Sequence, residues 1–294
     1  MTAPAAPRRQ ASHRRGRYEN GLPHLGTFDL VQFHSVKSRV LFCACRQSMI
    51  KRKTVRRKDM CTRFVYRGDE VITGFNFDID PAVWDYQIME EEDRFYIGIL
   101  RPDGARHAYH GVHRNGNAGT LLYVHGNPAG TYEDREGCVT VADLTEQFIR
   151  AQITFDEACS IAGTKKIVYA PDATMQAVLS DKGGRTLVIE PGIGCREDTG
   201  RYSLMTNYSL LSPESTRPFL VPGDDRYERA GRILSQYGNT FGVSDAFSLL
   251  HAVRQEGPWA TRVSFVFSAR EQAVCYVENN HFEQVKTFRF PAAG

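Results

Sequence analysis

The stretch that decides the fold is residues 60–78, Met-Cys-Thr-Arg-Phe-Val-Tyr-Arg-Gly-Asp-Glu-Val-Ile-Thr-Gly-Phe-Asn-Phe-Asp. Runs of apolar and β-branched residues on either side of Gly68-Asp69 predict a β-hairpin with strands over 61–67 and 71–77. A two-residue loop at this point suits a type II′ turn, because glycine supplies the positive φ that this turn needs. Pairing around that loop places Cys61 opposite Asn76, and Asp78 just beyond the end of the second strand.

This hairpin holds three groups that amide chemistry needs. If the chain began at Cys61, its α-amine would point at Asp78, with the thiol on the same residue. A free α-amine has a pKa near ~8 and can therefore act as both base and acid near neutral pH. While any residue precedes Cys61, its nitrogen is an amide and is not basic. The hypothesis therefore requires a chain that starts at Cys61.

The composition is that of a globular protein of one large or two small domains. Its 294 residues are 41% hydrophobic and 24% charged. No apolar run approaches the ~18 residues of a membrane-spanning helix, and the N-terminus lacks the apolar core of a signal peptide. The seven cysteines are irregularly spaced, and the histidines show no paired ligand spacing. We therefore expect a cytoplasmic protein with reduced thiols and with no metal or other cofactor.

The charge is distributed unevenly. Residues 1–60 contain 14 Lys and Arg against three Asp and Glu, a net charge of +11, whereas residues 61–294 carry −8. The first segment has no apolar periodicity, so we expect a basic, poorly ordered extension followed by one domain over 61–294.

The basic extension has three interpretations. The favoured one is a mis-assigned start: Arg56-Arg57-Lys58-Asp59 can be encoded by a purine-rich run directly ahead of the Met60 codon, as in a bacterial ribosome-binding site read in frame. The second is a propeptide whose removal exposes Cys61. The third, least favoured, is a basic arm that binds nucleic acid or an anionic membrane.

The pattern after the hairpin predicts further strands and helices. Thr140 and the capping-box pair Thr154 and Glu157 start two helices, and Ser244 is expected to cap another. The expected strands are 94–100, 105–111, 118–124, 166–170, 174–180, 185–190, 202–206, 261–268, 272–278 and 285–290. The expected helices are 140–150, 154–163, 225–237 and 244–253, and 192–200 is expected to be a loop. Segregated groups of strands and helices predict an α+β fold with two helix layers flanking antiparallel sheets.

Several motifs resemble those of one enzyme family. They are Cys61-Thr62, Gly74-Phe75-Asn76-Phe77-Asp78, Thr206-Asn207, Pro222-Gly223-Asp224 and the Arg226 to Arg229 helix start. In this order they are similar to the cholylglycine hydrolase and penicillin V acylase family of N-terminal nucleophile hydrolases. The resemblance covers 61–294 and none of 1–60. It implies a four-layer αββα sandwich, with two antiparallel sheets between helix layers.

The resemblance also implies catalytic roles. Cys61 would be the nucleophile and its amine the base, with Asp78 orienting that amine. Asn207 would donate to the oxyanion, Tyr123 falls at the position that completes the oxyanion hole, and Arg226 would hold the charges of the site in place.

The chain departs from the family at Phe75, where the family carries an arginine close to the thiol. Loss of that cation is expected to raise the pKa of the thiol. Arg63 lies two residues from Cys61, on the same face of its strand, and is hypothesised to compensate. Arg63, Phe75, Trp84 and Tyr86 are the candidate substrate-binding residues. Substrate recognition is expected from loops at 79–93 and 126–138, with aromatic residues such as Trp84, Tyr86 and Tyr132.

These observations together predict a hydrolase of a non-peptide linear amide C–N bond. Its substrate would be a small-molecule N-acyl amide, cleaved through a thioester on Cys61. One alternative is an acyltransferase that uses the same acyl-Cys61 intermediate. Another is a catalytically decayed binding protein with a nucleic-acid-binding arm, although a nucleic-acid partner is not expected. The resemblance implies a homo-oligomer, a tetramer in the family, and no membrane partner is expected.

Overall fold

Two antiparallel sheets form the centre of the part of the chain that the structure describes. The computed structural model describes residues 60–291, and the predicted extension over 1–59 lies outside them. Within the described residues, the six-stranded sheet has the order β12-β1-β2-β13-β14-β15 and the seven-stranded sheet the order β11-β10-β9-β6-β5-β4-β3. The first contains β1 (Thr62–Arg67), β2 (Val71–Asp78), β12 (Tyr202–Met205), β13 (Thr261–Ser268), β14 (Ala273–Glu278) and β15 (Lys286–Arg289). The second contains β3 (Tyr86–Glu90), β4 (Arg94–Leu100), β5 (Arg106–His113), β6 (Ala118–Tyr123), β9 (Met175–Ser180), β10 (Thr186–Glu190) and β11 (Gly194–Asp198).

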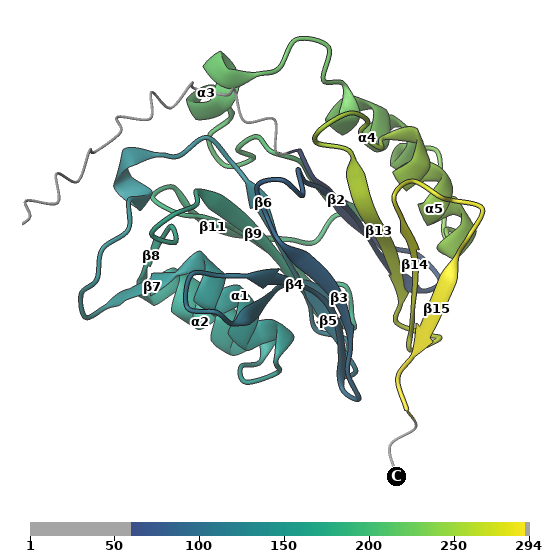
Figure 1. Cartoon of the computed structure of the whole chain (residues 1–294), viewed down its shortest axis with the longest axis horizontal. Helices are drawn as coiled ribbons and strands as arrows, with labels where there is room; N and C mark the ends of the chain where they lie inside the picture. The colour runs from purple at the N-terminus through teal and green to yellow at the C-terminus, as the bar shows by residue number, and fades with distance from the viewer. Residues whose placement is uncertain (1–59, 292–294) are drawn as a thin grey trace, which may run out of the picture. The chain divides into compact units, whose positions relative to one another are not determined.

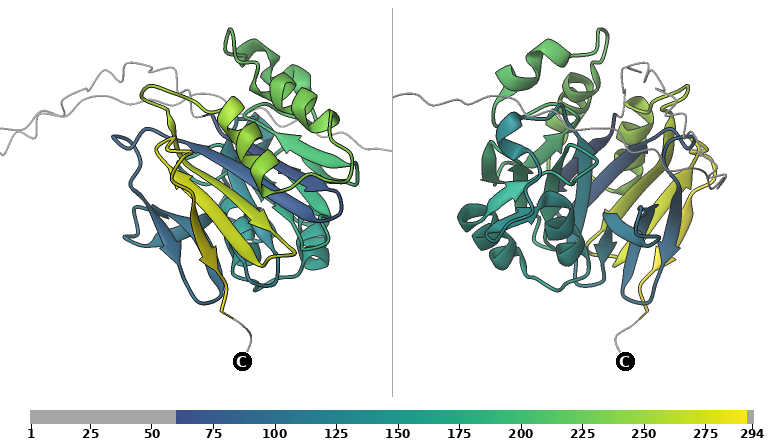
Figure 2. Two further views of the ribbon diagram at one scale, coloured as in Figure 1. Left: turned by 90° about the vertical axis from the view of Figure 1, so that its right-hand side faces the viewer. Right: turned by 60° about the vertical axis from the view of Figure 1, so that its left-hand side comes forward.

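Helices cover the outer face of each sheet (Figure 1). On the seven-stranded sheet lie α1 (Val141–Ile149) and α2 (Phe155–Thr164), next to the short parallel pair β7 (Cys138–Thr140) and β8 (Lys166–Val168). Across the six-stranded sheet lie α4 (Arg226–Ser235) and α5 (Val243–Ala252), as Figure 2 shows. The segment before α4 contains the short helices α3 (Pro213–Thr216) and η2 (Arg217–Phe219), and η1 (Pro128–Gly130) follows β6. The predicted four-layer αββα sandwich is confirmed.

Side chains that alternate along β1 and β2 place apolar residues on both faces of the six-stranded sheet. Phe64 and Tyr66 pack against α4 and α5, together with Phe241. The opposite face presents Phe75 and Phe77 to the seven-stranded sheet. All five rings are almost fully buried, so both faces of this hairpin lie in hydrophobic core.

The hairpin is confirmed, but its predicted turn and register are wrong by one residue. Arg67 pairs with Val71, so the loop has three residues, and Thr62 rather than Cys61 lies opposite Asn76. Gly68 is not among the residues with positive φ. It is required by close approach instead, because a Cβ at this position would lie 2.2 Å from the carbonyl oxygen of Asn239. That distant contact could not be read from the local sequence.

Most other predicted elements are present, with three corrections. The predicted loop 192–200 contains β11, which pairs with β10, and the predicted loop 79–93 contains β3, which pairs with β4. Thr140 and Thr154 do cap α1 and α2. Ser244, however, lies inside α5, whose start is fixed by Asp245 accepting a hydrogen bond from the Gly242 N–H at 3.0 Å.

The packing around Gly74 gives a prediction about stability. A Cβ at this position would lie 2.2 Å from the ring of Phe64, which is fully buried, so we expect Gly74→Ala to lower the free energy of unfolding by about 1–3 kcal/mol through overpacking. Gly163, in α2, has open space where its Cβ would be. Gly163→Ala is therefore the matched control, expected to raise stability by about 0.5–1 kcal/mol. Urea unfolding measures both changes, and a Gly74→Ala protein as stable as the parent would contradict this packing.

Candidate active site

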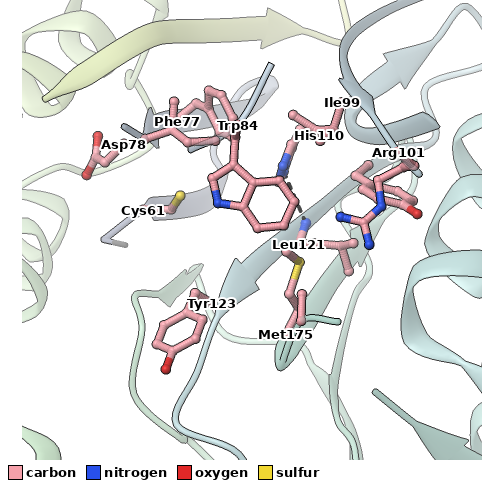
Figure 3. Close-up of a pocket in the computed structure, with 13 residues that line it drawn as sticks. Cys61, Phe77, Asp78, Trp84, Ile99, Arg101, His110, Leu121, Tyr123 and Met175 are labelled. Atoms are coloured by element: carbon pink, nitrogen blue, oxygen red, sulfur yellow. Dashed lines mark hydrogen bonds between the residues drawn. The ribbon is translucent and has the colours of Figure 1, made fainter. Parts of the chain in front are cut away.

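Cys61 and Asp78 lie together at one end of the paired strands β1 and β2. Cys61 directly precedes β1, Asp78 is the last residue of β2, and both line one cleft (Figure 3). Both are buried, with 6% and 1% of their surface exposed. Asp78 is therefore brought close to Cys61, as the sequence predicted, although by a register different from the expected one.

The two carboxylate oxygens of Asp78 have different surroundings. Oδ1 accepts a hydrogen bond from the hydroxyl of Thr261 at 2.6 Å. Oδ2 lies 3.7 Å from Nη1 of Arg226 but accepts no hydrogen bond within residues 60–291. Burial raises the pKa of Asp78 to about 7, against the lowering effects of Arg226 and Thr261. A buried acceptor that lacks a donor is rare in folded proteins and is a candidate functional atom.

Arg226 is the arginine that organises the site. Its side chain is almost fully buried, and Nη1 donates to the carbonyl oxygen of Cys61 at 2.8 Å. Nε and Nη2 donate to the two carboxylate oxygens of Asp224 at 2.8 and 2.9 Å. Burial opposes the charge of Arg226, but these partners and the charges of Asp78 and Cys61 raise its pKa. Arg226 therefore stays positively charged beside Cys61.

Asn207 and Tyr123 are adjacent in space, although they are distant in sequence. Asn207 Nδ2 donates to the main-chain carbonyl of Tyr123 at 2.8 Å, and its Oδ1 accepts from Arg226 Nη2 at 3.3 Å. These two bonds fix the orientation of the amide and leave its second N–H for another acceptor. Tyr123 lines the cleft, and Asn207, held against the Tyr123 carbonyl, is not itself among the lining residues.

The cleft has an empty volume of about 540 Å³, which includes space open to solvent. Figure 3 shows Cys61 and Asp78 on one side of the Trp84 ring and Arg101 on the other. Arg101 is ion-paired with Asp172 and lies 5.3 Å from the Trp84 ring and 5.8 Å from the Tyr109 ring. The remaining wall residues are largely apolar: Phe77, Ile79, Ile99, Leu121, Ala173 and Met175. Such walls suit an apolar acyl group.

The four residues predicted to bind substrate do not share one location. Trp84 lines the cleft, whereas Tyr86 packs edge-on against Phe77 outside it. Phe75 lies in the core between the sheets, stacked on His110. Arg63 is fully buried opposite Phe75 and donates to Ser180 Oγ at 2.9 Å and to the Phe64 carbonyl.

The guanidinium of Arg63 thus joins the two sheets, and Arg63 is not among the residues that line the cleft. Burial lowers its pKa to about 9. Its support of the Cys61 thiol stays a prediction, and the arginine that contacts Cys61 is Arg226, through the main-chain carbonyl.

Sequence reasoning missed several residues at the site. Asp224 belongs to the Pro-Gly-Asp motif, which is a usable signal, but the sequence alone assigns it no role. Thr261, His110 and Arg101 carried no local signal, because each acts through partners far away in the chain. Among the described residues, no group of three or more His, Cys, Asp or Glu could hold a metal ion, and no helix is long and apolar enough to cross a membrane.

The pKa of Asp78 predicts how stability depends on pH in a chain that retains Met60. The folded carboxyl titrates near 7 and the unfolded one near 3.8, so the folded state binds the proton more tightly. The stability that this group contributes is full below about pH 4 and is lost as the pH rises to about 7. Asp78→Asn removes this loss, so the free energy of unfolding of the variant, measured in urea, should rise relative to that of the parent between about pH 4 and pH 7. A difference that does not change with pH would contradict the assignment.

Comparison with known proteins finds similarity in structure only. No protein-family model matches the sequence, and no curated protein matches it. An arginine-to-leucine variant of conjugated bile acid hydrolase from Clostridium perfringens is 13% identical, with a TM-score of 0.61 over 80% of this chain and 94% of its own. Penicillin V acylase from Agrobacterium tumefaciens is 18% identical, with a TM-score of 0.53 over 74% of this chain and 83% of its own. The Caenorhabditis elegans ortholog of N-acylethanolamine-hydrolyzing acid amidase is 15% identical, with a TM-score of 0.52 over 79% of this chain and 100% of its own. The chain therefore shares the fold of these proteins, an αββα sandwich as the sequence resemblance implied.

Proposed function

We propose that this protein hydrolyses the C–N bond of a small-molecule N-acyl amide through a thioester on Cys61, acting as the N-terminal residue. We also propose that it is a member of the cholylglycine hydrolase and penicillin V acylase family. The observation that carries the proposal is Oδ2 of Asp78, a buried carboxylate oxygen that lies near Cys61 and that accepts no hydrogen bond from any residue between 60 and 291. An α-ammonium on Cys61 would supply that donor and a compensating charge.

The chemistry follows from an amine and a thiol on one residue. The α-amine takes the proton of the Cys61 thiol, and the thiolate sulfur forms a bond to the carbonyl carbon of the substrate. The resulting oxyanion collapses, the C–N bond breaks, and the α-ammonium returns its proton to the departing amine. Water, deprotonated by the same α-amine, then attacks the thioester. The C–S bond breaks, and the acid and the thiol are regenerated.

The surrounding residues support these steps in specific ways. Asp78 holds the α-amine in place and stabilises its charged form after proton transfer. The second N–H of the Asn207 amide is the proposed oxyanion donor, since Arg226 and the Tyr123 carbonyl already fix the rest of that side chain. Arg226, which donates to the Cys61 carbonyl, provides a positive charge beside the nucleophile, which matters because Phe75 occupies the position of the family arginine.

The proposal requires that Cys61 become the N-terminal residue of the chain. Residues 1–59 lie outside the described structure, so the proposal depends on one of the two routes that the sequence allows. Translation from Met60 followed by removal of that methionine is the favoured route, and removal of a propeptide is the other. The resemblance extends the proposal to a cytoplasmic homo-tetramer.

The requirement for an amine gives the most direct test of function. Two proteins are compared, one that begins at Cys61 and one with an extra glycine before it. We expect only the first to hydrolyse a panel of N-acyl anilides with aliphatic, aryloxyacetyl and steroid acyl groups. The second keeps the thiol but has an amide where the base should be. Equal activity of the two proteins would sink the N-terminal mechanism, and inactivity of both on the whole panel would sink the proposed function.

The proposed oxyanion donor has a matched control elsewhere in the fold. Asn207→Ala in the protein that begins at Cys61 should lower kcat by about 10²–10³, as loss of one oxyanion donor does. Asn117 is equally buried, with 6% of its surface exposed, and it donates to the Phe148 carbonyl far from the cleft. Asn117→Ala should therefore lower the thermal unfolding midpoint without lowering kcat. Equal kcat values for the two variants would remove Asn207 from the mechanism.

A further inference from the structure

His110 in β5 is a buried polar residue in the wall of an apolar cleft. It lines the cleft with Cys61 and Leu121, and 4% of its surface is exposed (Figure 3). Its ring stacks on Phe75, with centroids 5.1 Å apart and an interplanar angle of 18°, and lies 4.9 Å from the Phe77 ring. These contacts hold the imidazole in one plane, and the mechanism proposed above gives it no role.

The hydrogen bonds of the ring identify which nitrogen carries the proton. Nδ1 accepts the main-chain N–H of Leu121 at 3.3 Å, so Nδ1 is the unprotonated nitrogen. Burial lowers the pKa of His110 to about 3, so the ring is neutral at physiological pH. The proton of the neutral ring therefore lies on Nε2, which makes Nε2 a hydrogen-bond donor.

Nε2 has no hydrogen-bond partner within residues 60–291, and it is not one of the fully enclosed polar atoms that lack a partner. It therefore retains access to the cleft that the His110 side chain lines. A plain hydrocarbon bound there would displace water from this N–H without replacing the hydrogen bond, which is unfavourable. The cleft is thus suited to a ligand with an oxygen atom at this point.

The acyl group, rather than the amine, is the part of the substrate that meets His110. It stays bonded to Cys61 inside the cleft after the amine has departed, so the cleft walls must accommodate it. A charged acceptor is disfavoured, because the nearby walls are apolar and His110 is neutral. Arg101, a cation that also lines the cleft, is already ion-paired with Asp172 and so does not call for a charged acyl group.

We propose that His110 determines the acyl specificity of this site, by donating a hydrogen bond from Nε2 to an uncharged oxygen on the acyl group. The preferred substrates are then acyl amides with a keto, ether or hydroxyl oxygen in the chain, not plain alkanoyl amides. This inference rests on the proposed function for the identity of the bound group.

The test uses the anilides of octanoic, 3-oxooctanoic and 5-oxooctanoic acids with the protein that begins at Cys61. The kcat/KM of at least one oxo substrate should exceed that of the octanoyl substrate about tenfold, the effect of one neutral hydrogen bond. His110→Asn keeps an acceptor for the Leu121 N–H, but its shorter side chain holds the amide N–H groups back from the Nε2 position, so the ratio should fall to near one. His110→Gln keeps a donor near the position of Nε2 and should retain part of the preference.

Binding of the same anilides to the Cys61→Ala protein, followed by tryptophan fluorescence, separates this inference from the proposed function. A binding preference for an oxo anilide that His110→Asn abolishes supports the inference, even if the active protein cleaves none of the three. Cleavage of all three at similar rates would overturn the inference and leave the hydrolase intact. A preference that His110→Asn leaves unchanged, or equal binding of all three, would also overturn it.

Discussion

The structure of the site depends on the buried charge of Arg226. Its guanidinium contacts the chain directly before β1, the end of β2, the segment after β12 and the residue pair before α4, through Cys61, Asp78, Asn207 and Asp224. Removing one partner of such a buried ion pair typically costs about 3–5 kcal/mol, since the remaining charge is left uncompensated. Arg226 therefore joins four segments of the chain at one point and fixes the position of each relative to Cys61.

The same arrangement sets the electrostatics of the cleft. Asp224 is held ionised: its burial is outweighed by hydrogen bonds from Arg226 and Tyr208, which lower its pKa. The Asp224 carboxylate thus balances Arg226 from outside the cleft, and Asp78 on the inner side is left to pair with a second cation. Under our proposal that cation is the α-ammonium of Cys61, formed and consumed during the reaction. His110 adds no charge to the cleft wall, and under our proposal it offers the acyl group one N–H.

The sequence predicted features that arise from local periodicity and from motifs. Alternation of apolar residues was enough for the β1–β2 hairpin, and threonine caps were enough for α1 and α2. The register of the hairpin was missed, because Gly68 is required by the approach of Asn239, some 170 residues away in the chain. Arg63 was expected at the thiol because the strand pattern places it on the same face as Cys61. The direction of its side chain is set by Ser180 in the other sheet. Cys61, Asp78, Arg226, Asn207 and Tyr123 are brought into one connected group, whereas Thr261 and His110 act through long-range contacts that no local pattern encodes.

The central claim is that Cys61 is acylated as the first residue of the chain. The measurement that tests it most directly is mass spectrometry of the protein purified from its natural source and quenched in acid during turnover of an N-acyl anilide. The account predicts a chain that begins at Cys61 and gains the mass of one acyl group, located on the N-terminal peptide and released by hydroxylamine as a thioester should be. A chain that still carries residues before Cys61 while it turns over substrate, or an acyl group found on another residue, would contradict it.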